Sequence, residues 1–209
     1  MKNIKIPTVK PSEFDDYLFA NWKAPVNSLY ENFHVSRIED YKNYLKLPTP
    51  PHRRSVYFLL FITNGQVVRR KDLTKYELNK NTCFCLSADQ ITSIDFVSED
   101  ASGFYMHFLP DIFNHPNLKL DLGKDFPFFS NWNEPHFQIN DDKKIKNLFE
   151  MLIKEHLNEN KEVLPFYLMT LLLEIKNLAK INQNKKNDAS AILTYKYKNA
   201  LSEFIYSKK

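Results

Sequence analysis

The middle of the chain, from residue 54 to residue 109, consists of short runs rich in Val, Ile, Phe, Tyr and Thr. Turn residues separate these runs, as Asn64-Gly65 does between the first two, and this pattern predicts β-strands joined by tight turns. We expect six strands, at residues 54–62, 66–71, 75–79, 82–87, 91–98 and 103–109. Many short strands at this spacing indicate a sandwich or a barrel.

The apolar period changes from two to about 3.6 residues after Ile139, which predicts helices. Asn140, which two aspartates follow, is a helix start, because its side chain can cap free backbone amides. We expect the first helix to end near Asn158. A second helix should enter through Pro165, a residue that the first turn of a helix tolerates.

The second helix carries apolar side chains at alternating steps of four and three residues, the spacing of a heptad seam. The seam consists of Leu164, Leu168, Leu171, Ile175 and Leu178. Further apolar residues widen this face beyond a strict seam. Two interpretations stay open: the seam contacts a second copy in a homodimer, or it packs within the chain, and both can hold at once.

Residues 182–190 are polar and without periodicity, so we expect a linker there. Beyond the linker, residues 191–209 contain one more amphipathic segment. A single short helix cannot bury its apolar face alone. We therefore expect that the sequence is truncated within a further unit.

Composition limits the class of protein. A chain of 209 residues with 43% apolar residues can bury one sizeable core. The longest apolar runs fall far short of the ~20 residues of a membrane helix, and the N-terminus has no continuous apolar run for secretion. We expect a cytoplasmic protein with no membrane partner. Only three glycines occur, which excludes glycine-rich phosphate loops and the nucleophile elbow of serine hydrolases.

A histidine and two arginines precede the most apolar strand, in the stretch LPTPPHRRSVYFLLFITNG. Alternation along a strand places His52, Arg54 and Phe58 on one face. If this face is turned inward, its apolar side chains with polar groups at one end match the usual design of a small-molecule site, and such a site would suit an anionic or polar-headed ligand. In the alternative interpretation, Arg54 pairs with a carboxylate such as Asp95 or Glu77, and His52 caps a turn.

Several segments, in order, resemble the N-terminal cupin domain of AraC-type transcription regulators: PHRRSVYFLLFITNG, NTCFCLSADQITSI, SEDASGFYMHFLPDIF and DFPFF. The resemblance implies a mainly β fold with added helices, a cupin-like β-barrel (jelly roll) followed by two antiparallel helices. It implies a sensor barrel at 1–139 and a helical dimerisation segment at 140–181. It also implies that 191–209 is the first helix of a helix-turn-helix domain, so promoter DNA would be bound only through the absent remainder.

The cupin pattern usually begins H-x-H, with a glutamate and a third histidine later, and these residues converge on one metal ion. Here His52 matches the first histidine, Arg54 stands at the second, Phe58 lies near the glutamate and Thr92 occupies roughly the third histidine. A permanently charged arginine repels a divalent cation. We therefore expect no metal and no cofactor, and we assign His52, Arg54, Phe58 and Thr92 to binding of an unidentified small-molecule effector.

The leading hypothesis is thus a sensor and dimerisation module without catalytic activity. One alternative is a metal-dependent cupin enzyme, a dioxygenase or an isomerase, which the missing ligands disfavour. Another is a barrel that has lost its ligand and serves only for pairing.

Overall fold

The computed structural model describes residues 6–21, 23, 27–114, 120–130, 133–140 and 142–178, together with residues 193, 196, 197, 200, 201 and 204. The expected linker at 182–190 lies outside the described residues. So does most of the segment 191–209, which was expected to begin a DNA-binding domain.

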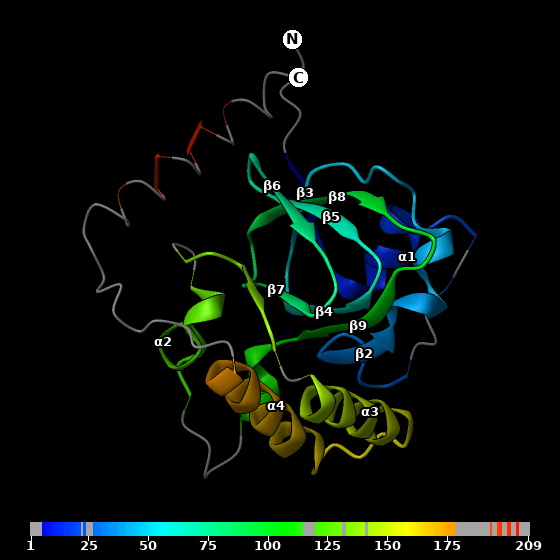
Figure 1. Ribbon diagram of the computed structural model, residues 1–209, viewed down its shortest axis with the longest axis vertical. Helices are drawn as coiled ribbons and strands as arrows, with labels where there is room; N and C mark the ends of the chain where they lie inside the picture. The colour runs from blue at the N-terminus through cyan, green and yellow to red at the C-terminus, as the bar shows by residue number, and fades with distance from the viewer. Residues whose placement is uncertain are drawn as a thin grey trace.

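The described strands form two five-stranded sheets that face each other (Figure 1). We call them the outer sheet and the central sheet. The outer sheet has the order β1 (Thr8–Val9), β3 (His52–Arg54), β8 (Ile91–Val97), β5 (Val67–Lys71), β6 (Thr74–Leu78). The central sheet has the order β10 (His136–Gln138), β7 (Thr82–Leu86), β4 (Tyr57–Asn64), β9 (Ser102–Phe108), β2 (Phe33–Arg37). All neighbours are antiparallel except β1 and β3.

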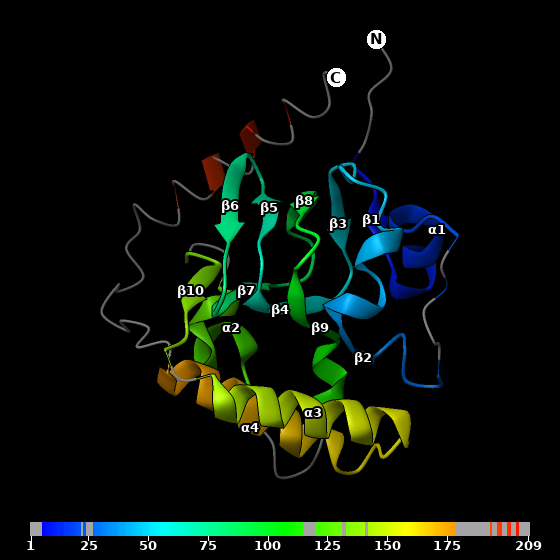
Figure 2. The same cartoon turned by 45° about the vertical axis from the view of Figure 1, so that its right-hand side comes forward.

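Two longer helices, α3 (Lys143–Leu157) and α4 (Leu164–Leu178), lie side by side against the central sheet (Figure 2). The order of layers is therefore outer sheet, central sheet and helices, and the expected architecture of a barrel followed by two helices is confirmed. Helix α3 has Asp142 at its N-cap rather than Asn140, so the expected capping by Asn140 is wrong. The remaining helical segments are short: η1 (Pro11–Glu13), α1 (Phe14–Leu18), η2 (Ile38–Asp40), η3 (Lys42–Tyr44), η4 (Pro110–Phe113), α2 (Leu122–Asp125) and η5 (Pro127–Phe129).

All six expected strands are present, but the first is divided. The chain leaves the outer sheet after β3 and enters the central sheet at β4, so the expected strand 54–62 spans a corner of the barrel. Strands β1, β2 and β10 had not been expected. Two of them are only two or three residues long, too short for a pattern of alternation to be visible.

The unbroken apolar run of β4 follows from the position of the central sheet. Phe58 and Leu60 belong to the cluster between the two sheets. Leu59 and Phe61 belong to a second cluster, which includes apolar side chains of α3 and α4. Because both faces of this strand are covered from Phe58 to Ile62, every position in that part of it is apolar and buried.

The seam of α4 packs within the chain. Leu164, Leu168, Leu171 and Ile175 are each 1% exposed or less, in the cluster that joins α3, α4 and the central sheet, and Leu178 packs partly buried against the same cluster. Of the two interpretations of the seam, contact with a second copy is therefore corrected. The face of the central sheet that is turned away from the outer sheet already covers these side chains. The exposed apolar side chains of α4 are Phe166 and Leu173.

Replacing Gly103 by alanine is expected to destabilise the fold by about 3 kcal/mol or more. Gly103 has a φ of +145°, and a Cβ there would lie 2.0 Å from the carbonyl oxygen of Phe61 in β4. Gly123→Ala is the matched control, because the nearest atom to its added Cβ lies 3.8 Å away. Thermal unfolding of the two variants tests the expectation, which equal melting temperatures would contradict.

Candidate functional site

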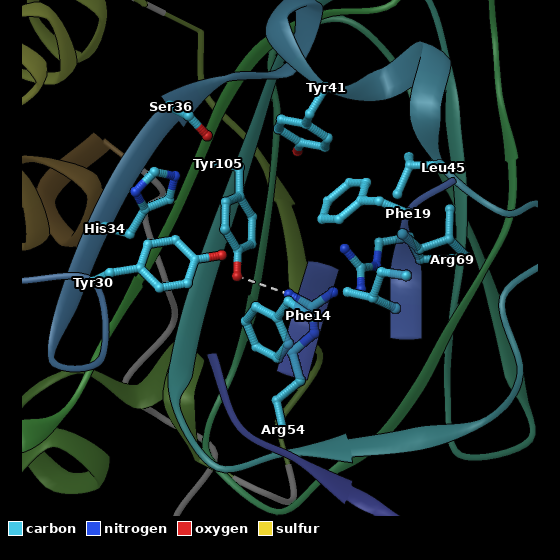
Figure 3. Close-up of a pocket in the computed structure, with 12 residues that line it drawn as sticks. Phe14, Phe19, Tyr30, His34, Ser36, Tyr41, Leu45, Arg54, Arg69 and Tyr105 are labelled. Atoms are coloured by element: carbon cyan, nitrogen blue, oxygen red, sulfur yellow. Dashed lines mark hydrogen bonds between the residues drawn. The ribbon is translucent and has the colours of Figure 1, made fainter. Parts of the chain in front are cut away.

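A cavity lies inside the barrel, next to α1 (Figure 3). Apolar side chains from α1 and the following loops line one part of it: Phe14, Leu18, Phe19 and Leu45. Ile94 of β8 and polar side chains line the rest; the polar ones are Tyr30, His34, Ser36, Tyr41, Arg54, Arg69 and Tyr105. Water-sized molecules can occupy about 30 Å³ of this space, which is room for roughly two or three waters.

Arg54 is fixed by a chain of buried hydrogen bonds. Its Nη1 donates to the hydroxyl of Tyr105 at 2.8 Å, and that hydroxyl lies 3.1 Å from Nδ1 of His107. Nε2 of His107 lies 2.8 Å from the backbone carbonyl of Tyr30. Because a carbonyl only accepts, the imidazole proton is on Nε2, and Nδ1 accepts from Tyr105. Burial lowers the pKa of His107 to about 3, so this ring is neutral at pH 7.

His52 holds Arg54 from the other side. Its Nδ1 lies 2.8 Å from the carbonyl of Pro50, and its Nε2 lies 3.4 Å from Nε of Arg54. The ring is fully buried, and burial, followed by the charge of Arg54, lowers the pKa of His52 to about 3. His52 is therefore a neutral acceptor that positions the guanidinium, and it does not line the cavity.

Of the four residues assigned to ligand binding from the sequence, only Arg54 lines the cavity. Phe58 is 1% exposed, and its ring lies 4.8 Å from the Cζ of Arg54. Thr92 donates its hydroxyl to the carbonyl of Arg70 and pairs with His52 across β3 and β8. His52 and Phe58 thus lie at the guanidinium of Arg54, whereas the side chain of Thr92 lies at that of Arg69. The role of the four residues in binding stays a prediction.

Arg69 of β5 also lines the cavity, and the sequence analysis missed it. This side chain is 2% exposed, and its Cζ lies 4.7 Å from the ring centroid of Phe58. Burial, with a smaller contribution from Arg54, lowers the pKa of Arg69 to about 9, so the guanidinium still carries its charge at neutral pH. Alternation along VVRRK could have identified it, because Arg69 follows the inward Val67 at a step of two.

Neither buried guanidinium is paired with a carboxylate of the residues that the structure describes. Asp95, a partner considered for Arg54, pairs with Arg70 at 2.7 Å. Glu77, the other candidate, pairs with Lys75 at 3.1 Å, so the expected alternative ion pairs of Arg54 are wrong. Within the described part of the chain, no acidic side chain forms an ion pair with Arg54 or Arg69.

Aromatic rings stabilise the two buried guanidinium groups in part. The Cζ of Arg54 lies 4.9 Å from the centroid of Phe14 and 4.8 Å from that of Phe58. A desolvated cation–π contact contributes about 2 kcal/mol, whereas desolvating a buried ion still costs several kcal/mol after relaxation. The aromatic contacts therefore offset only part of the cost of burying two charges, and the cavity keeps a strongly positive lining.

The donor set does not fit a cupin metal. The nitrogen of His52 that a metal would need faces the guanidinium of Arg54, and a cation at that distance repels a divalent ion. Among the residues that the structure describes, no group of three or more His, Cys, Asp or Glu side chains is arranged to hold a metal ion. No helix within the described ranges has the length and apolar character needed to cross a membrane.

The chain has solved structural neighbours but no match in sequence. No family model matches it, and no curated protein matches it. The AraC-like transcriptional activator CuxR is 14% identical with a TM-score of 0.42, over 68% of this chain and 52% of that chain. ToxT from Vibrio cholerae, solved with an unsaturated fatty acid bound, is 12% identical with a TM-score of 0.43, over 75% of this chain and 58% of that chain. The Cnp3 cupin domain of Schizosaccharomyces pombe is 15% identical with a TM-score of 0.31, over 45% of this chain and 61% of that chain.

These neighbours include AraC-type regulators, the family that the sequence resembles, and the likeness is one of fold. The matches span about half of the length of CuxR and less than two thirds of that of ToxT. Two facing sheets with a pair of helices on one side define the chain as a cupin-like barrel domain.

Proposed function

We propose that the chain is the effector-sensing and dimerisation part of an AraC-type transcription regulator, with a small molecule as its effector. The observation that carries the proposal is the positively charged cavity inside the barrel, lined by Arg54 and Arg69. In this proposal residues 1–139 sense the effector, residues 140–181 associate, and residues 182–190 lead to a DNA-binding unit that begins at 191–209. Promoter DNA is bound by that unit and not by the barrel.

The effector acts by favouring one arrangement of barrel and helices over another, because a ligand shifts an equilibrium only through its differential affinity. The cavity is small, so an effector larger than a few waters must displace side chains around it. His34 of β2 lines the cavity, and its ring centroid lies 5.1 Å from that of His156 in α3. An effector that displaces His34 would therefore act directly on α3 through His156.

Homodimer formation, in this proposal, uses the outer side of the helical layer. The seam of α4 is buried within the chain, which leaves the exposed apolar side chains Phe166 and Leu173 for a second copy. A metal-dependent cupin enzyme is disfavoured by the donor set around His52. A barrel that pairs without an effector is the remaining alternative, and ligand binding separates it from the proposal.

Native mass spectrometry of the purified chain tests the proposed function. We expect a non-covalently bound small molecule, at about one per chain, that Arg54→Lys weakens by about 1 to 3 kcal/mol, because a point charge replaces a planar fork of donors. Arg53→Lys is the matched control, since this neighbouring side chain is only half-buried and donates to the backbone of Asp89. About one tightly bound transition metal per chain in elemental analysis would favour an enzyme, and absence of any bound small molecule after incubation with cell extracts would favour the ligand-free barrel.

A further inference from the structure

The guanidinium groups of two arginines from the outer sheet lie in the same buried region. Arg54 of β3 and Arg69 of β5 come from strands on either side of β8, and both line the cavity. They are 4% and 2% exposed, and their Cζ atoms lie 4.8 and 4.7 Å from the centroid of the same ring, that of Phe58. In Figure 3 the side chain of Arg54 rises toward Tyr105, while Arg69 lies on the side of Phe19 and Leu45.

The donors of these guanidiniums are not fully used. Nε of Arg69 is buried and has no hydrogen-bond partner in the described structure, and its Nη2 reaches Thr92 only at 3.4 Å. A buried donor without a partner is rare in native proteins and calls for an explanation. The next residue along β5 shows the contrast, because the half-buried Arg70 has a carboxylate at 2.7 Å. The fold therefore supplies a counter-charge to the outward arginine and none to the inward one.

The other titratable groups of the cavity bring no negative charge. Burial raises the pKa of Tyr30, Tyr41 and Tyr105, which keeps the three phenols neutral at pH 7. Burial also lowers the pKa of His34 well below its ordinary value, so this ring is neutral as well. Among the described residues that line the cavity, Arg54 and Arg69 are therefore the charged groups, and neither forms an ion pair with a described carboxylate.

We propose, on the basis of the proposed function, that the effector carries a compact group with two negative charges, which binds to Arg54 and Arg69 together. A phosphate monoester and a pair of neighbouring carboxylates share this chemistry. Both present several acceptor oxygens to the planar guanidinium, which recognises such groups through paired hydrogen bonds. The cavity is about the size of a phosphate group, so a dicarboxylate or a larger carbon skeleton must displace the apolar side chains of α1 that lie beside the arginines.

Thermal unfolding and titration calorimetry with inorganic phosphate, malonate, acetate and glucose, at constant ionic strength, test the proposal. We expect phosphate or malonate to raise the melting temperature of the wild-type chain clearly more than acetate, and glucose to have no effect. A response to phosphate alone assigns a phosphate monoester, and a response to malonate alone assigns a dicarboxylate. Arg69→Met and Arg54→Met should weaken the binding of the dianion by about ten- to a hundredfold.

Matched controls lie next to each arginine along its strand. Arg70→Met and Arg53→Met remove the same charge from half-buried positions and should retain the response to the dianion. Without added anion, Arg69→Met should be as stable as the wild type or more stable, because a buried charge with no counter-ion is replaced by an apolar side chain of similar length. A structural role for Arg69 predicts a lower melting temperature instead.

Three results would overturn the inference: no dianion stabilises the wild-type chain, the control variants lose the response as fully as the cavity variants, or Arg69→Met is strongly destabilised without anion. A neutral molecule identified in the barrel by native mass spectrometry, without any response to dianions, would overturn the inference and leave the proposed function standing. Dianion binding with no effect on association of the chain would overturn the proposed function alone.

Discussion

Leu171→Asp is expected to unfold the chain. The side chain of Leu171 is fully buried, in the cluster that joins α3, α4 and the central sheet. Truncating a buried leucine to alanine already costs about 2–5 kcal/mol, and a carboxylate at the same place adds the cost of burying a charge without a partner. Because a domain of this kind is stable by only about 5–15 kcal/mol, we expect circular dichroism and calorimetry to show loss of the cooperative transition.

Leu173→Asp is the control for this substitution, two residues further along α4. Leu173 is 44% exposed, so we expect the variant to fold with a melting temperature close to that of the wild type. If the outer side of α4 joins two copies, the same variant lowers the mass in sedimentation. A folded Leu171→Asp variant with reduced mass would contradict the assignment of the seam to the core.

The heptad seam illustrates what a linear pattern leaves undecided. A stripe of leucines along α4 has the same spacing whether a second copy or a sheet covers it. The deciding information lies in another part of the chain, where Leu59 and Phe61 interrupt the alternation of β4. A strand that is apolar on both faces needs a second covering layer, and the two helices are the elements able to supply it.

Alternation along the strands predicted the cavity-lining side chains better than the search for oppositely charged partners did. Alternation predicted Arg54 on the inner face, and Arg54 lines the cavity. The same rule applied to β5 would have identified Arg69. The suggested partner Asp95 is wrong for a related reason: its neighbour Ile94 is buried toward the cavity, so Asp95 points the opposite way and pairs with Arg70. Charge complementarity alone does not distinguish the two faces of a strand.

The shortest strands and the chain of hydrogen bonds behind Arg54 could not be predicted. β1 is two residues long and pairs with β3 through contacts that its own sequence does not encode. The bonds from Arg54 to Tyr105 and from His107 to the carbonyl of Tyr30 join residues far apart in the sequence, and tertiary packing brings them together. The sequence gives no sign that His107 links a tyrosine hydroxyl to a backbone carbonyl, because that carbonyl belongs to Tyr30, 77 residues earlier in the chain.

Buried histidines should make the fold sensitive to mild acid. His52 and His107 are both fully buried, and burial lowers the pKa of each to about 3 from an ordinary value of 6.5. Below pH 6.5 the unfolded chain binds protons at these positions while the native chain does not, so stability falls as the pH falls. Above pH 6.5 both states are neutral there, and the two histidines make no difference.

Lowering the pH from 7.5 to 4.5 is expected to reduce the free energy of unfolding by about 5 kcal/mol through His52 and His107 together. Each pH unit below 6.5 lowers the free energy of unfolding by about 1.4 kcal/mol per histidine. This decrease continues until the pH approaches the native pKa of about 3. Between pH 6.5 and 5 carboxylates contribute little, because most remain ionised in both states.

Urea unfolding at half-unit steps of pH should therefore give a dependence of the free energy of unfolding on pH that His52→Asn and His107→Gln reduce together. Asn keeps a donor for the carbonyl of Pro50 and Gln keeps one for that of Tyr30, whereas His136→Gln, at the exposed edge strand β10, should leave the slope unchanged. A wild-type stability that is constant from pH 7 to 5 would contradict the expectation, since native histidines with ordinary pKa values produce no such slope.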